Sequence, residues 1–181
     1  KKKKWAGGEE SSRSRPGGMA LPRVLVVACA PRTGMGAEED ARIDASVGAE
    51  VRGYGALGGQ LALQAERNIA PEGLRSALDG QGALVFSGHG NAAFGGRHTL
   101  AFVAPDGGLS VIQAAQLADI ISAHAPVQGG GLRLVLLNAC ETRDLARALI
   151  EAGVPDVVCW ETEVDTVAAT PFGIKLIEHW A

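Results

Sequence analysis

A histidine and a cysteine each follow a short apolar run in this sequence. His89 stands between two glycines after residues 83–86 in "ALVFSGHGNAAF", and Cys140 follows residues 132–139 in "LRLVLLNACET". In open parallel sheets ligands bind beyond the carboxyl ends of the strands, so two paired strands would bring both side chains to one edge. A thiol within hydrogen-bond reach of an imidazole is an activated nucleophile with its base. The alternative interpretation is a solvated histidine in a tight turn and a cysteine that acts as a small buried apolar residue.

The surroundings of Cys140 favour the nucleophile interpretation. A helix is expected to begin around Thr142, so the amides of its first turn face the sulfur and favour the thiolate. The small residues beside His89 leave room for a substrate carbonyl. The backbone amides of Gly90 and Cys140 are then the candidates to hold a developing oxyanion.

The elements that must position these residues alternate between strand and helix. Near-continuous apolar runs predict strands buried on both faces at residues 24–30, 83–86, 132–139 and 157–160. Apolar periodicity predicts helices over residues 110–125, 143–153 and 166–180. Ser110 and Gln113 have capping-box spacing at the start of the first helix, and Thr170-Pro171 is either a cap with the first helical position or a kink. The alternation predicts an α/β protein, a three-layer αβα sandwich with a mostly parallel central sheet.

Two segments do not follow this alternation. Residues 31–60 are rich in glycine and weakly periodic, which predicts a long loop or insertion. We expect this loop to be the least ordered internal segment and to close over the cleft. Residues 1–20 contain four lysines and no apolar core, which predicts a disordered tail before a single domain at residues 21–181.

Composition excludes several classes of protein. The 181 residues are 46% apolar and 20% charged, and the mean hydropathy of +0.10 is typical of a soluble globular domain. A net charge of −3 gives no electrostatic case for binding nucleic acid or an anionic membrane, and no apolar run reaches the length of about 18 residues that spans a bilayer. Three cysteines, Cys29, Cys140 and Cys159, do not predict a disulfide framework, which favours a reducing, cytoplasmic setting.

The sequence predicts neither a metal site nor a cofactor. The cysteines and histidines lack C-x-x-C or H-x-x-x-H spacing, and His98, His124 and His179 are expected at the surface. A nucleotide-binding protein of the flavodoxin type would need a phosphate loop. "PRTGMG" after the first strand lacks the Lys-Ser/Thr ending of such a loop.

From about Arg23 to its end, the chain resembles the CHAT domain, a family of caspase-like and separase-like cysteine peptidases. "RVLVVACAP" resembles the first strand of the family, "LALQAERNI" a segment that enters a helix, "LVFSGHGN" the histidine strand and "LVLLNACET" the nucleophile strand. The resemblance implies a caspase-like fold with Cys140 as nucleophile, His89 as general base and Gly90 as an oxyanion amide. It implies a protein or peptide substrate, and tetratricopeptide-like repeats elsewhere in the full chain. The alternative is a catalytically silent CHAT module that acts as a regulatory or protein-interaction domain.

The chain departs from the family pattern at two places. In "VDTVAA", Thr166 stands where the family has an acidic residue near the pocket for the substrate's P1 side chain, and Asp165 comes one position earlier. Asp165 is therefore a candidate pocket residue. Arg32, in a loop at a strand end, and Glu141, which either lines the cleft or faces water, are the other two candidates. The family also inserts a helix and a strand before the histidine strand, for which this chain is too short. Either that strand is lost, or residues 44–60 supply it out of order.

Overall fold

The computed structural model describes residues 20–32, 36–90 and 99–181. The predicted tail at residues 1–20 lies outside these ranges except for its last residue. Among the described residues, a five-stranded, fully parallel sheet has the order β2-β1-β3-β6-β7. Its strands are β1 (Arg23–Ala28), β2 (Ala62–Arg67), β3 (Ala83–Ser87), β6 (Leu134–Asn138) and β7 (Asp156–Val158). The four predicted strands are confirmed.

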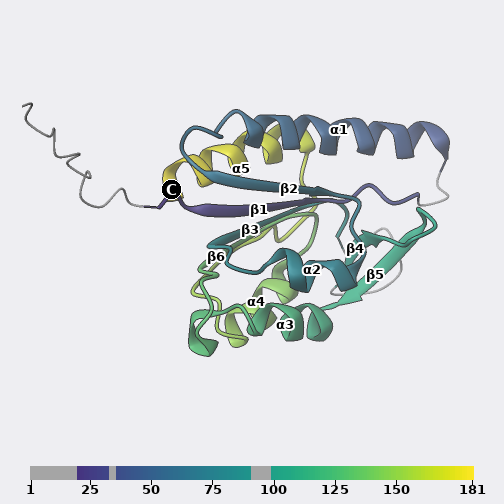
Figure 1. The fold of residues 1–181 in the computed structure, drawn as a ribbon. Coiled ribbons are helices and arrows are strands. Elements are labelled where there is room, and N and C mark those ends of the chain that lie inside the picture. Colours follow the sequence, from purple (N-terminus) through teal and green to yellow (C-terminus); the bar gives the residue numbers. More distant parts are fainter. Residues whose placement is uncertain (1–19, 33–35, 91–98) are drawn as a thin grey trace, which may run out of the picture.

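Helices cover both faces of this sheet (Figure 1). One layer holds α1 (Ala37–Gly55) and α5 (Thr166–Trp180), and the opposite layer holds α2 (Pro71–Ala77), α3 (Ala114–Ser122) and α4 (Arg143–Glu151). Successive strand residues point to opposite faces. Val24 and Val26 accordingly belong to the α1–α5 core, whereas Leu25 and Val27 belong to the core on the other face. The predicted three-layer sandwich is confirmed.

The prediction of a loop over residues 31–60 is wrong, because α1 occupies most of it. Val47 and Tyr54 of α1 are buried in the core, so this helix is not a mobile cover for the cleft. Residues 44–60 also supply no strand, because a turn follows α1 as far as residue 60. One of the glycines that weakened the helical pattern serves close packing: a Cβ on Gly53 would overlap Ile174 of α5. On the facing helix, a Cβ on Gly173 of α5 would overlap the Tyr54 hydroxyl.

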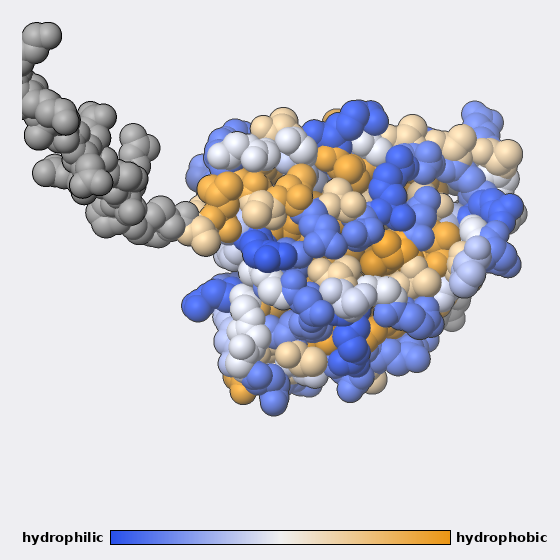
Figure 2. Space-filling view, viewed as in Figure 1, coloured by the Kyte–Doolittle hydropathy of each residue, from blue (hydrophilic) through white to orange (hydrophobic). Residues whose placement is uncertain are grey.

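"LALQAERNI" forms the edge strand β2, and α2 begins shortly after it at Pro71, as the resemblance implied. Exposed and half-buried positions are mixed along this strand, as expected at an edge that has a partner on one side only. The face of the molecule in Figure 2 carries its apolar side chains in separate patches among polar ones. No helix in the described part of the chain is long and apolar enough to cross a membrane.

The predicted helix over residues 110–125 begins four residues later than expected. Residues Leu109–Gln113 form strand β5, which pairs antiparallel with β4 (Thr99–Val103). The Pro-Asp-Gly-Gly turn between them favours a hairpin over an early helix start. The capping box is made by Gln113 and Gln116, not by Ser110.

The other two predicted helices, α4 and α5, are confirmed. Asp165 caps α5, and Pro171 lies inside the helix, so Thr170-Pro171 is not the helix start. On α5, Ile177 is buried, whereas Phe172 is 43% exposed and rests edge-on against Trp160.

The close contact between α1 and α5 can be tested with Gly173→Ala. We expect this change to lower the free energy of unfolding by about 1–3 kcal/mol, because the added methyl group overlaps the buried Tyr54 hydroxyl. In the control Gly55→Ala, the added Cβ meets no atom within 4 Å, and we expect a gain of up to about 1 kcal/mol. Urea denaturation measures both. Equal effects would contradict the close packing of the two helices.

Candidate active site

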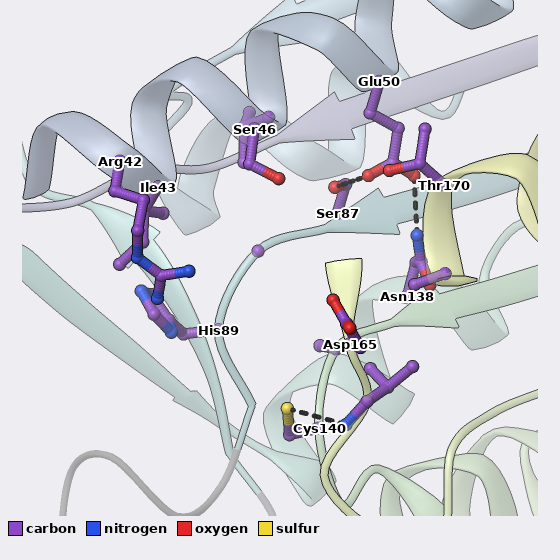
Figure 3. A pocket seen from close by; sticks show the side chains of 15 residues that line it. Arg42, Ile43, Ser46, Glu50, Ser87, His89, Asn138, Cys140, Asp165 and Thr170 are labelled. Atoms are coloured by element: carbon purple, nitrogen blue, oxygen red, sulfur yellow. Dashed lines mark hydrogen bonds between the residues drawn. The ribbon is translucent and has the colours of Figure 1, made fainter. Parts of the chain in front are cut away.

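A cavity of about 220 Å³ opens at the carboxyl ends of β3 and β6. Helix α1 contributes Arg42 and Glu50 to its lining, the two strand ends contribute His89 and Cys140, and the start of α5 contributes Asp165 (Figure 3). β3 pairs in parallel with β6, with Ser87 opposite Asn138. The prediction that the strands ending at His89 and Cys140 are adjacent and parallel is therefore confirmed.

Close backbone contacts explain the two glycines that flank His89. A Cβ on Gly88 would lie 2.8 Å from the carbonyl oxygen of Cys29, and a Cβ on Gly90 would overlap the carbonyl oxygen of Cys140. The segment that carries His89 therefore rests directly on the backbone of the segment that carries Cys140. Any larger residue at position 90 would push the two segments apart.

Cys140 lies in a sharp turn between β6 and α4. Glu141 has a φ of 51°, a left-handed conformation that few non-glycine residues adopt. The turn is fixed by hydrogen bonds: the Thr142 amide donates to the Trp160 carbonyl at 2.9 Å, and the buried Thr142 hydroxyl donates to the Ala139 carbonyl at 3.1 Å. α4 begins at Arg143, close to the predicted start.

The thiol and the imidazole occupy different parts of the cavity. The Cys140 sulfur accepts a hydrogen bond from the Val164 amide at 3.5 Å. In Figure 3 the His89 imidazole points away from this sulfur and toward the guanidinium of Arg42. The strand ends thus bring both residues to one cavity, in a conformation in which their side chains do not face each other.

A buried carboxyl at the inner end of the cavity was not predicted. Glu50 is only 4% exposed and accepts hydrogen bonds from Asn138 Nδ2 at 2.7 Å, from Tyr54 Oη at 3.3 Å and from the Ser87 hydroxyl. Burial raises the pKa of Glu50, although these three hydrogen bonds oppose the shift in part. The sequence signal was the spacing of Ile43, Val47, Glu50 and Tyr54 along one helix face, which the neighbouring glycines obscured.

The three predicted pocket residues have different positions. Asp165 lines the cavity and also caps α5, accepting the Val167 amide at 2.9 Å. Arg32 instead holds the β4–β5 turn: its Nε donates to the Gly107 carbonyl at 3.3 Å, and its guanidinium also donates to the Asp106 carbonyl. Glu141 is not among the described residues that line the cavity.

The other two cysteines, Cys29 and Cys159, are not among the residues that line this cavity. Burial raises the pKa of the Cys29 thiol to about 12. The pKa of Cys159 is also raised, by burial and then by the charge of Glu161. All three cysteines are free thiols, and the described residues include no cluster of His, Cys, Asp and Glu that could hold a metal ion.

Comparison with known proteins identifies the family. The family model for the CHAT domain matches residues 19–181. The chain belongs to the CHAT domain family. The CHAT domain is a caspase-like family, which is the general kind of protein that the sequence predicted.

The solved structures that resemble this chain are only distantly similar to it. A flavodoxin from Streptococcus pneumoniae is 10% identical with a TM-score of 0.40, covering 88% of this chain and 99% of the flavodoxin. A pilus assembly-related protein from Burkholderia pseudomallei is 15% identical with a TM-score of 0.34, covering 88% of each chain. No curated protein matches the chain in sequence.

The contact between the two strand ends predicts the effect of Gly90→Ala. Overpacking against the Cys140 carbonyl is expected to lower the free energy of unfolding by about 1–3 kcal/mol and to displace the Cys140 turn. The control is Gly59→Ala, where an added Cβ meets nothing within 4 Å. Urea denaturation measures stability, and the Cys140 amide resonance in an NMR spectrum reports the displacement. An unmoved resonance in Gly90→Ala would contradict the contact.

The buried carboxyl predicts a pH dependence of stability. Because the pKa of Glu50 is raised in the folded state above its ordinary value of 4.5, its favourable contribution is complete below pH 4.5 and is lost as the pH rises through the folded-state pKa. Across that window the wild type should lose up to about 1.4 kcal/mol per pH unit relative to Glu50→Gln, which does not titrate. Denaturation curves measured between pH 4 and 9 test this. Parallel stability profiles of the two proteins would show that Glu50 titrates normally.

Proposed function

We propose that this CHAT domain is a cysteine endopeptidase in which Cys140 is the nucleophile and His89 the general base. One observation carries the proposal: the two residues follow the adjacent parallel strands β3 and β6 and line the same cavity. The family to which the chain belongs supports the same chemistry.

The reaction assigns a role to each group. His89 takes the thiol proton of Cys140, and the thiolate forms a bond to the carbonyl carbon of the substrate. The amides of Gly90 and Cys140, whose backbones are in contact, donate to the resulting oxyanion. The C–N bond then breaks, the imidazolium gives its proton to the leaving amine, and a thioester remains on Cys140. Water, deprotonated by His89, hydrolyses the thioester and restores the thiol.

The proposal requires the His89 side chain to turn from Arg42 toward Cys140 when a substrate binds. Hydrogen bonds between catalytic groups are often long in unliganded enzymes and tighten in the complex. The amide of Val164 already donates to the sulfur and holds it at the cavity. The cavity then receives the side chain of the P1 residue, with Asp165 at its side.

A catalytically silent CHAT module is the second candidate. The observation that favours it is the orientation of the His89 imidazole, which points away from the Cys140 sulfur. In that case the site would serve the binding of a protein partner. The rate of alkylation by iodoacetamide at pH 7 separates the candidates: an activated Cys140 is modified faster than Cys159, whereas equal, slow modification of the two supports the silent module.

A peptide-library cleavage assay tests the peptidase directly. We expect Cys140→Ala, Cys140→Ser and His89→Ala each to reduce cleavage by at least 1,000-fold, because the nucleophile and the base act as a unit. Cys159→Ala is the matched control and should cleave like the wild type. Cleavage by Cys140→Ala at the wild-type rate would refute the assignment.

Asp165→Asn tests whether Asp165 contributes to specificity. Asparagine is as good an N-cap as aspartate, so α5 should keep its stability while the charge in the cavity is lost. We expect the preferred P1 residue to change and the maximal rate to stay within about threefold of wild type, which is under 1 kcal/mol. Cleavage profiles of the two proteins on the peptide library test this. Identical profiles would show that Asp165 does not contribute to P1 specificity.

A further inference from the structure

The carboxyl of Glu50 is bonded to the last residue of each strand that leads to the proposed dyad. Ser87 ends β3 two residues before His89, and Asn138 ends β6 two residues before Cys140. The Ser87 hydroxyl donates to one Glu50 oxygen, and Asn138 Nδ2 donates to the other at 2.7 Å. Figure 3 shows both hydrogen bonds converging on this one side chain.

The sheet register makes this arrangement possible. Ser87 and Asn138 are direct partners in the β3–β6 ladder, so their side chains leave the sheet on the same face, the one that α1 covers. Ser87, Asn138 and Glu50 are each less than 10% exposed. Water therefore competes little for these hydrogen bonds, and a bridged pair of strand ends is held more firmly than by backbone pairing alone.

We propose that Glu50 is a positioning residue of the peptidase: by joining Ser87 to Asn138, it fixes the placement of the His89 segment relative to the Cys140 segment. This inference rests on the proposed dyad. Glu50 acts through the two strand ends and takes no part in the bond-making steps.

A third segment is connected to the same bridge. Asn138 Oδ1 accepts a hydrogen bond from Trp160 Nε1 at 2.9 Å. Trp160 lies in the connection between β7 and α5, which also contains Val164, whose amide donates to the Cys140 sulfur. The Asn138 side chain is thereby fixed at both ends, and its orientation is set by Glu50 on one side and by Trp160 on the other.

Tyr54 provides the matched control for this role. Its hydroxyl also donates to Glu50, at 3.3 Å, and it is fully buried, but it lies on α1 and leads to neither strand end. Ser87→Ala and Tyr54→Phe each remove one hydroxyl and one buried hydrogen bond to the same carboxyl. If Glu50 has a purely structural role, the two variants should have similar kcat values. If it is a positioning residue, kcat should fall in Ser87→Ala and not in Tyr54→Phe.

The experiment compares steady-state cleavage of one library-selected peptide by the wild type, Ser87→Ala, Tyr54→Phe, Glu50→Gln and Glu50→Leu. We expect kcat to fall at least tenfold in Ser87→Ala and Glu50→Leu with KM within twofold of wild type. Tyr54→Phe should keep wild-type kcat although it melts at a lower temperature. Glu50→Gln should stay within threefold, because its carboxamide can accept from Asn138 and donate to the Ser87 oxygen.

Each outcome decides between the proposals. Equal kcat in Ser87→Ala and Tyr54→Phe, or a change confined to KM, overturns the positioning role and leaves the peptidase assignment intact. A wild type that cleaves no peptide and in which Cys140 is alkylated no faster than Cys159 overturns the dyad and the positioning role with it. If Glu50→Leu does not fold, the comparison of Ser87→Ala with Tyr54→Phe gives the answer alone.

Discussion

The parallel pairing of β3 with β6 is the constraint on which the site depends. It places Ser87 opposite Asn138 and so delivers the two following segments to one edge of the sheet. A shift of the register by one residue would turn Asn138 to the opposite face and break its hydrogen bond to Glu50. Core packing and the polar contacts of the cavity therefore specify the same register, with Leu137 and Phe86 buried on one face and the Glu50 bridge on the other.

Two glycines, Gly90 and Gly173, allow close contacts that a side chain would prevent. Gly90 lets the histidine segment rest on the Cys140 backbone, and Gly173 lets α5 approach Tyr54 of α1. The first contact sets the distance between the two chemically active segments. The second holds the helix layer from which Glu50 reaches the strand ends. Both contacts are too close for a methyl group. At Gly90 the backbone packs directly on another backbone segment, and at Gly173 it packs on a side chain.

The sequence predicted those parts of the fold in which one local signal dominates. Continuous apolar runs identified the buried strands, and the residues at their carboxyl ends identified His89 and Cys140. α1 was missed because its glycines weaken a helical pattern, although Gly53 is needed for the contact with α5. With α1 missed, Glu50 could not be placed, since its role depends on tertiary contact with two distant strands. Arg32 follows a strand end like His89, but only the structure reveals that the hairpin turn at Asp106 and Gly107 holds it.

The account requires the Cys140 thiolate and the His89 imidazole to meet over a bound substrate. The most direct measurement is a crystal structure of the CHAT domain with a peptide aldehyde whose side chains match the preferred cleavage sequence. We predict a covalent bond from the Cys140 sulfur to the aldehyde carbon, the P1 side chain in the cavity, and the His89 imidazole turned to within about 3 Å of the reacting atoms. An aldehyde bound to another residue, or an imidazole still directed at Arg42 while Cys140 is modified, would contradict the dyad.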